Sequence, residues 1–154
     1  MRRPGATLIM AAFVLAGACR LSDAAAEWHA GAARAVARNV QAANSDHTVV
    51  VLGSVGGPRG EELPWAVVQS LTTGGVEVGD TTALRRPRTL LLIFEHTERA
   101  DGEWIVDTRL ERGAAAGDDE APDDGLTRHA RWRVQCNDDP CVVTDMLQRP
   151  DAQR

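Results

Sequence analysis

The sequence TVVVL at residues 48–52 is a run of β-branched and aliphatic residues without polar alternation. Such a run predicts a short strand that is buried on both faces of a sheet. A glycine-rich loop follows at residues 53–60. Pro64 then opens a predicted helix, because the missing N–H of a proline costs nothing in the first helical turn. The side chains expected on the buried face of this helix are Trp65, Val68 and Leu71.

A second strand is predicted directly after this helix. Gly74-Gly75 ends the helix, and residues 76–78 read Val-Glu-Val. Strand, helix and strand in this order make a βαβ unit, in which the two strands are parallel and the helix crosses over them.

The downstream half predicts antiparallel hairpins. Residues 90–96 are strongly apolar and residues 104–110 alternate, and Asp101-Gly102 between them is a typical hairpin turn. A second hairpin is predicted from the alternating residues 130–134 and from residues 142–146.

Residues 22–44, upstream of the βαβ unit, predict a helix. Its apolar face would be formed by Trp28, Ala32, Ala35, Val36, Val40 and Ala43. We therefore expect an α+β fold at residues 27–147. It would be a single small domain in which the βαβ unit and the antiparallel hairpins form one mixed sheet with helices packed on it.

Two polar segments are expected to lie outside the sheet. Residues 113–125 are acidic, have no apolar residue larger than alanine, and predict a mobile loop. They do not have the ligand spacing of a calcium-binding loop. Residues 148–154 predict a frayed tail.

The N-terminus has the pattern of an export signal. Arg2 and Arg3 precede an apolar stretch at residues 6–18. The stretch is shorter than the roughly 20 residues that a membrane-spanning helix needs. Its last four residues and Cys19, Leu-Ala-Gly-Ala-Cys, resemble the lipobox of bacterial lipoproteins, whose cysteine thiol receives diacylglycerol.

This resemblance implies a signal peptide at residues 1–18, lipidation of Cys19 and a tether at residues 19–26. An alternative cut for ordinary signal peptidase follows Ala24-Ala25-Ala26. That cut would leave a soluble exported protein.

The number and spacing of the cysteines agree with export from the cytosol. Cys136 and Cys141 are separated by the turn-forming sequence Asn-Asp-Asp-Pro, which predicts a disulfide across a hairpin. Disulfides persist in oxidising compartments, and lipid on Cys19 would leave no free thiol. A zinc site is the weaker interpretation, because two thiolates need two further ligands and no such spacing accompanies them. A redox-active pair is weaker again, because four intervening residues do not make a C-x-x-C motif.

Composition excludes several classes of function. The net charge is −5, so electrostatic binding of nucleic acid is not expected. All 17 basic residues are arginines, which excludes any mechanism that requires a lysine. The loop at residues 53–60 matches neither the P-loop nor the dinucleotide fingerprint, and Ser54 does not lie in a nucleophile elbow. We expect no nucleotide, no other cofactor and no metal.

Few side chains are candidates for chemistry. The histidines fall on four separate predicted elements: His29, His47, His96 and His129. The carboxylates that could do acid–base work lie on the predicted central hairpin, where solvated strand charges explain them more simply: Glu95, Asp107 and Glu111. A compact basic cluster is a candidate surface for an anionic partner or a lipid head group: Arg85, Arg86 and Arg88.

The order of elements also carries a resemblance. The chain resembles the TrbH-type lipoproteins of conjugative transfer systems in the order of its elements. This order is a lipobox cysteine, a helix, a strand, PWAVVQSL at residues 64–71, GVEV at residues 75–78 and an antiparallel pair. Gly-Leu-Thr-Arg at residues 125–128 is similar to a Leu-Ser-Arg step in that family. The strand and helix order also resembles the α/β unit of outer-membrane lipoproteins such as LpoB and CsgG. These resemblances imply action by protein contact and bring no catalytic residues.

The expected function is that of an envelope lipoprotein, held at the membrane through Cys19, which binds envelope proteins as an accessory or assembly component of a secretion or conjugation machine. The residue after the cysteine is Arg20 and not aspartate. The likeness to sorted lipoproteins therefore implies that the protein is located at the outer membrane, facing the periplasm. One alternative is an immunity or inhibitor lipoprotein against a secreted toxin. Another is a small exported hydrolase that uses Glu95, Asp107 or a histidine.

Overall fold

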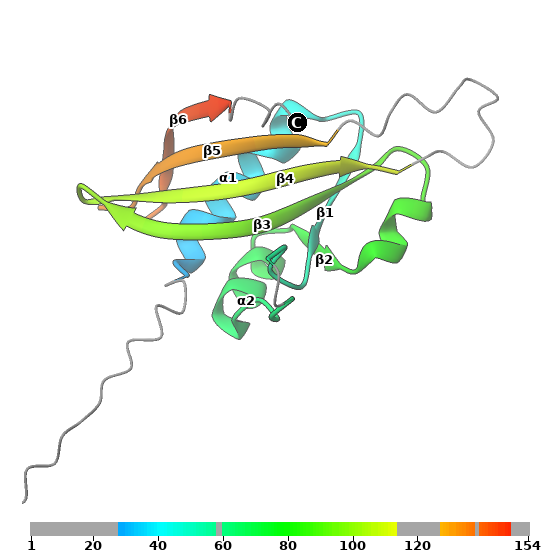
Figure 1. The fold of residues 1–154 in the computed structure, drawn as a ribbon, viewed down its shortest axis with the longest axis horizontal. Coiled ribbons are helices and arrows are strands. Elements are labelled where there is room, and N and C mark those ends of the chain that lie inside the picture. The colour runs from blue at the N-terminus through cyan, green and yellow to red at the C-terminus, as the bar shows by residue number, and fades with distance from the viewer. Residues whose placement is uncertain (1–27, 58–59, 114–126, 138, 149–154) are drawn as a thin grey trace, which may run out of the picture.

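The structure, a computed structural model, describes residues 28–57, 60–113, 127–137 and 139–148. Figure 1 shows their arrangement. The elements are α1 (Ala30–Ala43), β1 (Thr48–Leu52), α2 (Trp65–Thr73), β2 (Glu77–Gly79), the 3₁₀ helix η1 (Thr81–Arg85), β3 (Thr89–Ala100), β4 (Glu103–Arg112), β5 (Arg128–Gln135) and β6 (Val142–Gln148). They make the predicted small α+β domain.

The six strands form one mixed sheet in the order β2-β1-β3-β4-β5-β6. β1 pairs in parallel with β2 and with β3, whereas β3 to β6 form an antiparallel meander. The predicted βαβ unit is confirmed, with α2 between the parallel strands β1 and β2. β2 begins at Glu77, one residue later than predicted.

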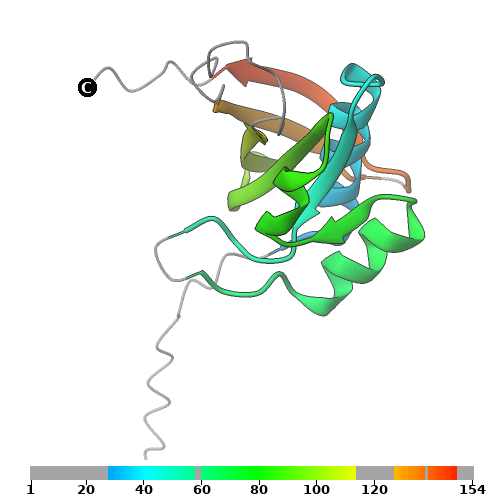
Figure 2. The same cartoon turned by 90° about the vertical axis from the view of Figure 1, so that its right-hand side faces the viewer.

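α1 and α2 cover one face of the sheet. Figure 1 shows α1 crossing behind the antiparallel strands, and Figure 2 shows α2 beside β2. Alternate residues of the strands reach this face and pack with the helices into the main core. Its members include Val36, Val40, Val49, Val51, Leu71, Leu92, Phe94, Val106, Trp132 and Val134.

Within the described ranges, the helical cover of the opposite face lies at one end of the sheet. Ala83 and Leu84 of η1 pack there on Val50, Leu91 and Ile93. Val50 therefore belongs to this second cluster while its neighbours in β1 belong to the main core, which confirms that β1 is buried on both faces. Away from η1, this face carries charged and polar side chains, and we call it the open face. These side chains are Glu95, Asp107, Arg109, Glu111, His129 and Arg131.

The predicted buried face of α2 is wrong at Trp65, which is 75% exposed. Val67 and Leu71, one helical turn apart, are fully buried instead, and Val68 is partly buried. Trp65 is the first residue of the helix and lies two positions before Val67, about 200° around the axis from the buried stripe. It therefore points away from the core.

The predicted first helix is confirmed over Ala30–Ala43, and His29 is its N-cap. Ala43, which was expected on the apolar face, is exposed at the last position of the helix. Ala33 and Ala37 are buried in addition to the predicted Ala32, Val36 and Val40, whereas Ala35 is only partly buried. Trp28, which was expected on the apolar face of the helix, precedes the N-cap and packs against the main core from outside the helix.

The β3–β4 turn forms at the predicted residues. Asp101 and Gly102 both have positive φ angles, 53° and 84°. This is the conformation of the two-residue turn that matches the twist of a hairpin and that favours an Asp-Gly sequence.

Several predictions concern residues that the structure does not describe. These are the signal peptide at 1–18, the lipidated Cys19, the tether at 19–26, nearly all of the acidic segment at 113–125, and the tail beyond Gln148. Gln148 itself was expected in the tail and instead ends β6. Among the described helices, none is long and apolar enough to cross a membrane.

Candidate functional site

A disulfide ties β5 to β6. Cys136 and Cys141, the cysteines that the sequence pairs, have their sulfur atoms 2.15 Å apart. Both side chains are partly buried and touch the main core. Because only five positions separate them, the bond closes a small ring and holds this hairpin, not the whole domain.

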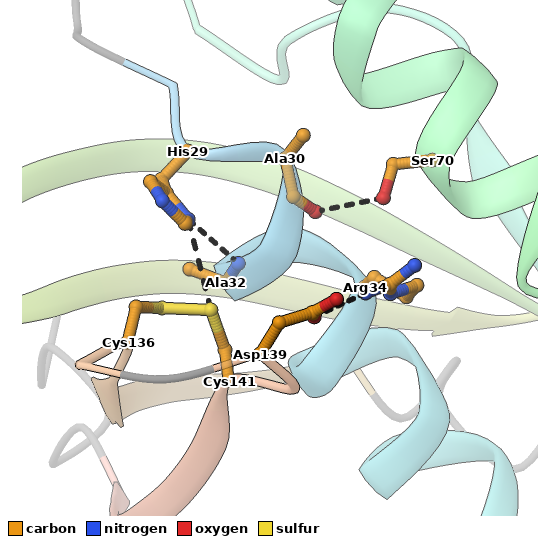
Figure 3. The surroundings of a disulfide bond; sticks show 8 residues. All are labelled: His29, Ala30, Ala32, Arg34, Ser70, Cys136, Asp139 and Cys141. Carbon is orange, nitrogen blue, oxygen red and sulfur yellow. Dashed lines mark hydrogen bonds and ion pairs between the residues drawn. A yellow bond between two sulfur atoms is a disulfide. The ribbon is translucent and has the colours of Figure 1, made fainter.

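His29 lies against this disulfide (Figure 3). As the N-cap of α1, its Nδ1 accepts a hydrogen bond from the backbone N–H of Ala32 at 3.2 Å. The same Nδ1 is 3.8 Å from Sγ of Cys141. On the core side, the imidazole ring stacks at a tilt against Trp104, with 5.0 Å between ring centroids. The contact with Ala32 requires a lone pair on Nδ1, so this nitrogen is unprotonated in the arrangement described.

Gly31 allows this approach. A Cβ at this position would lie 2.7 Å from Sγ of Cys141 and 3.2 Å from Cε1 of His29. Glycine costs a helix about 1 kcal/mol relative to alanine. Here the missing side chain lets the first turn of α1 rest directly on the disulfide.

A hollow of about 350 Å³ opens beside the disulfide. Arg34, Ser70, Asn137 and Asp139 line it together with His29 and the two cysteines. Arg34 donates to the Asp139 carboxylate at 3.1 Å, and the Ser70 hydroxyl of α2 donates to the carbonyl oxygen of Ala30 at 3.3 Å. Figure 3 shows both contacts flanking the start of α1. The site is therefore built from α1, α2 and the β5–β6 turn, which are far apart in the sequence.

The carboxylates predicted for acid–base work lie on the open face. Asp107 is only 4% exposed, and Nε and Nη2 of Arg131 each donate to it at 2.8 Å. The hydrogen bond to Asp107, and then the opposite charge, raise the pKa of Arg131 above its ordinary value. This pairing explains how a carboxylate is tolerated at a buried strand position.

Glu95 and Glu111 flank Arg109, and His129 lies against Glu95. Nε of Arg109 is 3.5 Å from Glu95 and 3.3 Å from Glu111, and Nδ1 of His129 is 3.3 Å from the second oxygen of Glu95. The structure therefore brings these candidates together, apart from Asp107. Each carboxylate faces a cationic or ionisable neighbour, which favours an ion-pair network on a strand surface over acid–base chemistry.

The predicted basic cluster does not form one free patch. Arg86 donates to Glu77 at 2.7 Å. That hydrogen bond lowers the pKa of Glu77 and raises the pKa of Arg86. Arg88 adopts a positive φ of 52°, and its carbonyl oxygen accepts from the N–H of Thr48. Arg85, Arg86 and Arg88 are all exposed, but the charge of Arg86 is already paired.

The two remaining histidines lie elsewhere. Nε2 of His47 is 3.3 Å from Nη2 of Arg112, and His96 is 3.8 Å from Glu98 on β3. The four histidines thus occupy four different places in the fold.

The outer edge of the sheet at β6 is a further feature. β6 is seven residues long, and no strand within the described ranges pairs with its outer side. Its large apolar side chains are exposed: Val142 by 58%, Met146 by 48% and Leu147 by 41%. An edge strand presents unpaired N–H and C=O groups to which another chain can hydrogen-bond.

Sequence reasoning missed the partnership of His29 with the disulfide. His29 and Cys141 are separated by 112 positions. The predicted helix over residues 22–44 placed His29 inside a helix and not at its cap. The glycine at position 31 was the available signal, because a glycine in an alanine-rich helix indicates close approach of another group.

Comparison of the chain with protein families, curated proteins and solved structures found no match.

Proposed function

We propose that this chain is an exported protein, anchored to a membrane through lipid on Cys19, that binds another envelope protein as an accessory or assembly component of a cell-envelope machine. The observation that carries the proposal is the β6 edge, with Val142, Met146 and Leu147 exposed. The disulfide between Cys136 and Cys141 supports export, because such bonds persist in oxidising compartments.

The proposed mode of binding is strand addition. An extended segment of the partner would pair with the free side of β6, where main-chain hydrogen bonds give affinity. Along β6 the side chains alternate between the two faces of the sheet. Met146 lies opposite Trp132 on the helix-covered face, and Leu147 lies opposite Arg131 on the open face. The partner would thus bury an apolar side chain on each side of the sheet.

Site-specific photocrosslinking tests the surface. A photoreactive residue at Met146 in the full chain, expressed in its native cell, is expected to give a crosslink to one envelope protein. The same probe at Trp65 is the control, since Trp65 is more exposed and lies on α2. The combined change Met146→Glu and Leu147→Glu is expected to abolish co-purification of that protein, and Trp65→Glu to preserve it. Equal crosslinks from both positions, or none from Met146, would overturn strand addition at β6.

A separate measurement tests the anchor. The intact mass of protein purified from membranes is expected to match three acyl chains on a chain that begins at Cys19. Cys19→Ala is expected to release the protein from sedimented membranes. A chain that begins at Glu27 would instead show a soluble exported protein, and the strand-addition test would still apply to it.

A further inference from the structure

We propose that reduction of the Cys136–Cys141 disulfide creates a Zn²⁺ site whose protein ligands are Cys136 Sγ, Cys141 Sγ and His29 Nδ1. This inference goes beyond the proposed function and does not depend on a partner. One ligand atom from each of the three residues lies within 4.8 Å of the others. The third ligand, absent from any spacing in the sequence, is supplied by the start of α1.

The distances fit tetrahedral zinc. With Zn–S of about 2.3 Å and Zn–N of about 2.0 Å, a sulfur and a nitrogen on the same tetrahedral ion are separated by about 3.5 Å, and two sulfurs by about 3.8 Å. His29 Nδ1 and Cys141 Sγ are already 3.8 Å apart. Once the S–S bond is cleaved, only Cys136 has to move substantially. Both cysteines lie outside the paired strands, Cys136 directly after Gln135 of β5 and Cys141 directly before Val142 of β6.

The donor set suits zinc. Two thiolates and a neutral imidazole neutralise the charge of Zn²⁺, and soft thiolates with imidazole select zinc over magnesium or calcium. The Nδ1 lone pair of His29 points toward the hydrogen-bonded Ala32 N–H and the disulfide, and Trp104 supports the ring from the core side. Metal binding would replace the Ala32 contact at this nitrogen.

All three ligand residues line the hollow of about 350 Å³, which leaves room for a fourth ligand such as water. Three protein ligands with an open position occupied by water is an established zinc geometry. The Asp139 carboxylate, on the rim of the hollow, accepts a hydrogen bond from Nη2 of Arg34 at 3.1 Å. The opposite charges of this pair therefore offset each other beside the metal.

The redox step balances with a dithiol as reductant. The dithiol gives two electrons and two protons to the disulfide, which yields two cysteine thiols and the oxidised, cyclic disulfide of the reductant. Zn²⁺ then displaces the two thiol protons as it binds both sulfurs. Oxidation of the thiols destroys the site, so the redox state of the hairpin controls metal binding.

The test uses the full chain reduced with dithiothreitol, freed of reductant without oxygen, and titrated with Co²⁺ and with Zn²⁺ against a chromophoric chelator. We expect one metal ion per chain and a thiolate-to-cobalt charge-transfer band of tetrahedral intensity. We expect no binding by the oxidised chain. Absence of stoichiometric binding by the reduced chain would overturn the proposal.

His29→Asn is the decisive variant, because asparagine is among the best N-cap residues but supplies no imidazole. It is expected to weaken zinc binding at least tenfold, since even loss of a group that only orients a ligand costs about 10–100-fold. His129→Asn on the open face is the matched control and is expected to leave affinity unchanged. Equal affinity of His29→Asn and the unaltered chain would show a two-thiolate site and refute the role of His29. Circular dichroism of each variant establishes that it is folded.

Discussion

The two faces of the sheet are stabilised by different interactions. On the face covered by α1 and α2, Phe94 and Trp132 pack in a continuous apolar core. On the open face, Asp107 pairs with Arg131, and Glu95 lies beside Arg109. Apolar burial contributes roughly 25 cal/mol per Å², whereas a solvent-exposed ion pair contributes about 0–1 kcal/mol. We therefore expect stability to be concentrated on the covered face, and the open face to tolerate change except where a charge is buried.

The largest effect is expected from Phe94→Ala. Phe94 is fully buried and meets Trp28 edge-on, with 5.7 Å between ring centroids. Loss of its ring should lower the free energy of unfolding by about 3–5 kcal/mol, as measured by urea unfolding. His96→Ala, an exposed change on the same strand, should stay within about 0.5 kcal/mol. Similar losses of unfolding free energy for the two variants would contradict the expectation that stability is concentrated on the covered face.

Asp107→Asn should have the largest effect among the ion pairs of the open face. The change removes a charge-assisted, two-pronged contact with Arg131 from a buried position. We expect a loss of about 1.5–3 kcal/mol in urea unfolding, because hydrogen bonds to charged groups contribute about that much. Glu98→Gln removes the carboxylate of the exposed His96–Glu98 pair and should change stability by less than about 1 kcal/mol. If Glu98→Gln lowered the free energy of unfolding as much as Asp107→Asn, burial of the carboxylate would not determine how much an ion pair on this face stabilises the fold.

Trp132→Phe tests a polar contact within the covered face. Nε1–H of Trp132 donates to Oγ1 of Thr108 at 2.8 Å, and both residues are buried. Phenylalanine keeps the aromatic packing but leaves the Thr108 hydroxyl without this donor, at a cost of about 0.5–1.5 kcal/mol. The double variant with Thr108→Val should cost less than the sum of the two single changes, as measured by a double-mutant cycle. Strict additivity would show that the two groups do not interact.

The smallest effect concerns acid sensitivity at η1, which covers the end of the open face. The hydroxyl and backbone N–H of Thr82 donate to Asp80 and lower the pKa of its carboxyl below 3.8. The resulting stabilisation is present above about pH 4 and is lost as the pH falls through the folded-state pKa. Asp80→Asn should therefore differ most from the unaltered chain at neutral pH, and the difference in unfolding midpoint should shrink below pH 4.

Thr82→Ala gives the companion measurement, because the Thr82 hydroxyl is the largest cause of the lowered pKa of Asp80. Its removal should shift the acid-dependent part of the unfolding profile toward higher pH. An acid profile unchanged by either substitution would show that Asp80 does not couple to folding.

The sequence predicted those parts of the fold that depend on local pattern. The apolar run in β1, the Asp101-Gly102 turn and the glycines after α2 each constrain a few adjacent residues, and all three appear as expected. Trp65 was misplaced because its hydrophobicity suggested burial, whereas the position of Val67 and Leu71 around the helix decides which side faces the sheet.

The candidate site was less predictable. The disulfide could be inferred because Cys136 and Cys141 are neighbours across one turn. The position of His29 depends on where α1 crosses the sheet, and that is set by packing between elements from opposite ends of the chain. The same applies to Glu95 and His129, which meet only through the pairing of β3 with β4 and of β4 with β5.

β3 is the strand at which the parallel and antiparallel halves meet, and this has a consequence for the order of folding. It joins β4 through a two-residue turn, but its pairing with β1 must close a long loop that contains α2, β2 and η1. Because closing a longer loop costs more chain entropy, the meander is favoured to assemble first. We therefore expect destabilising changes in β1 to speed unfolding and to leave the refolding rate nearly unaltered.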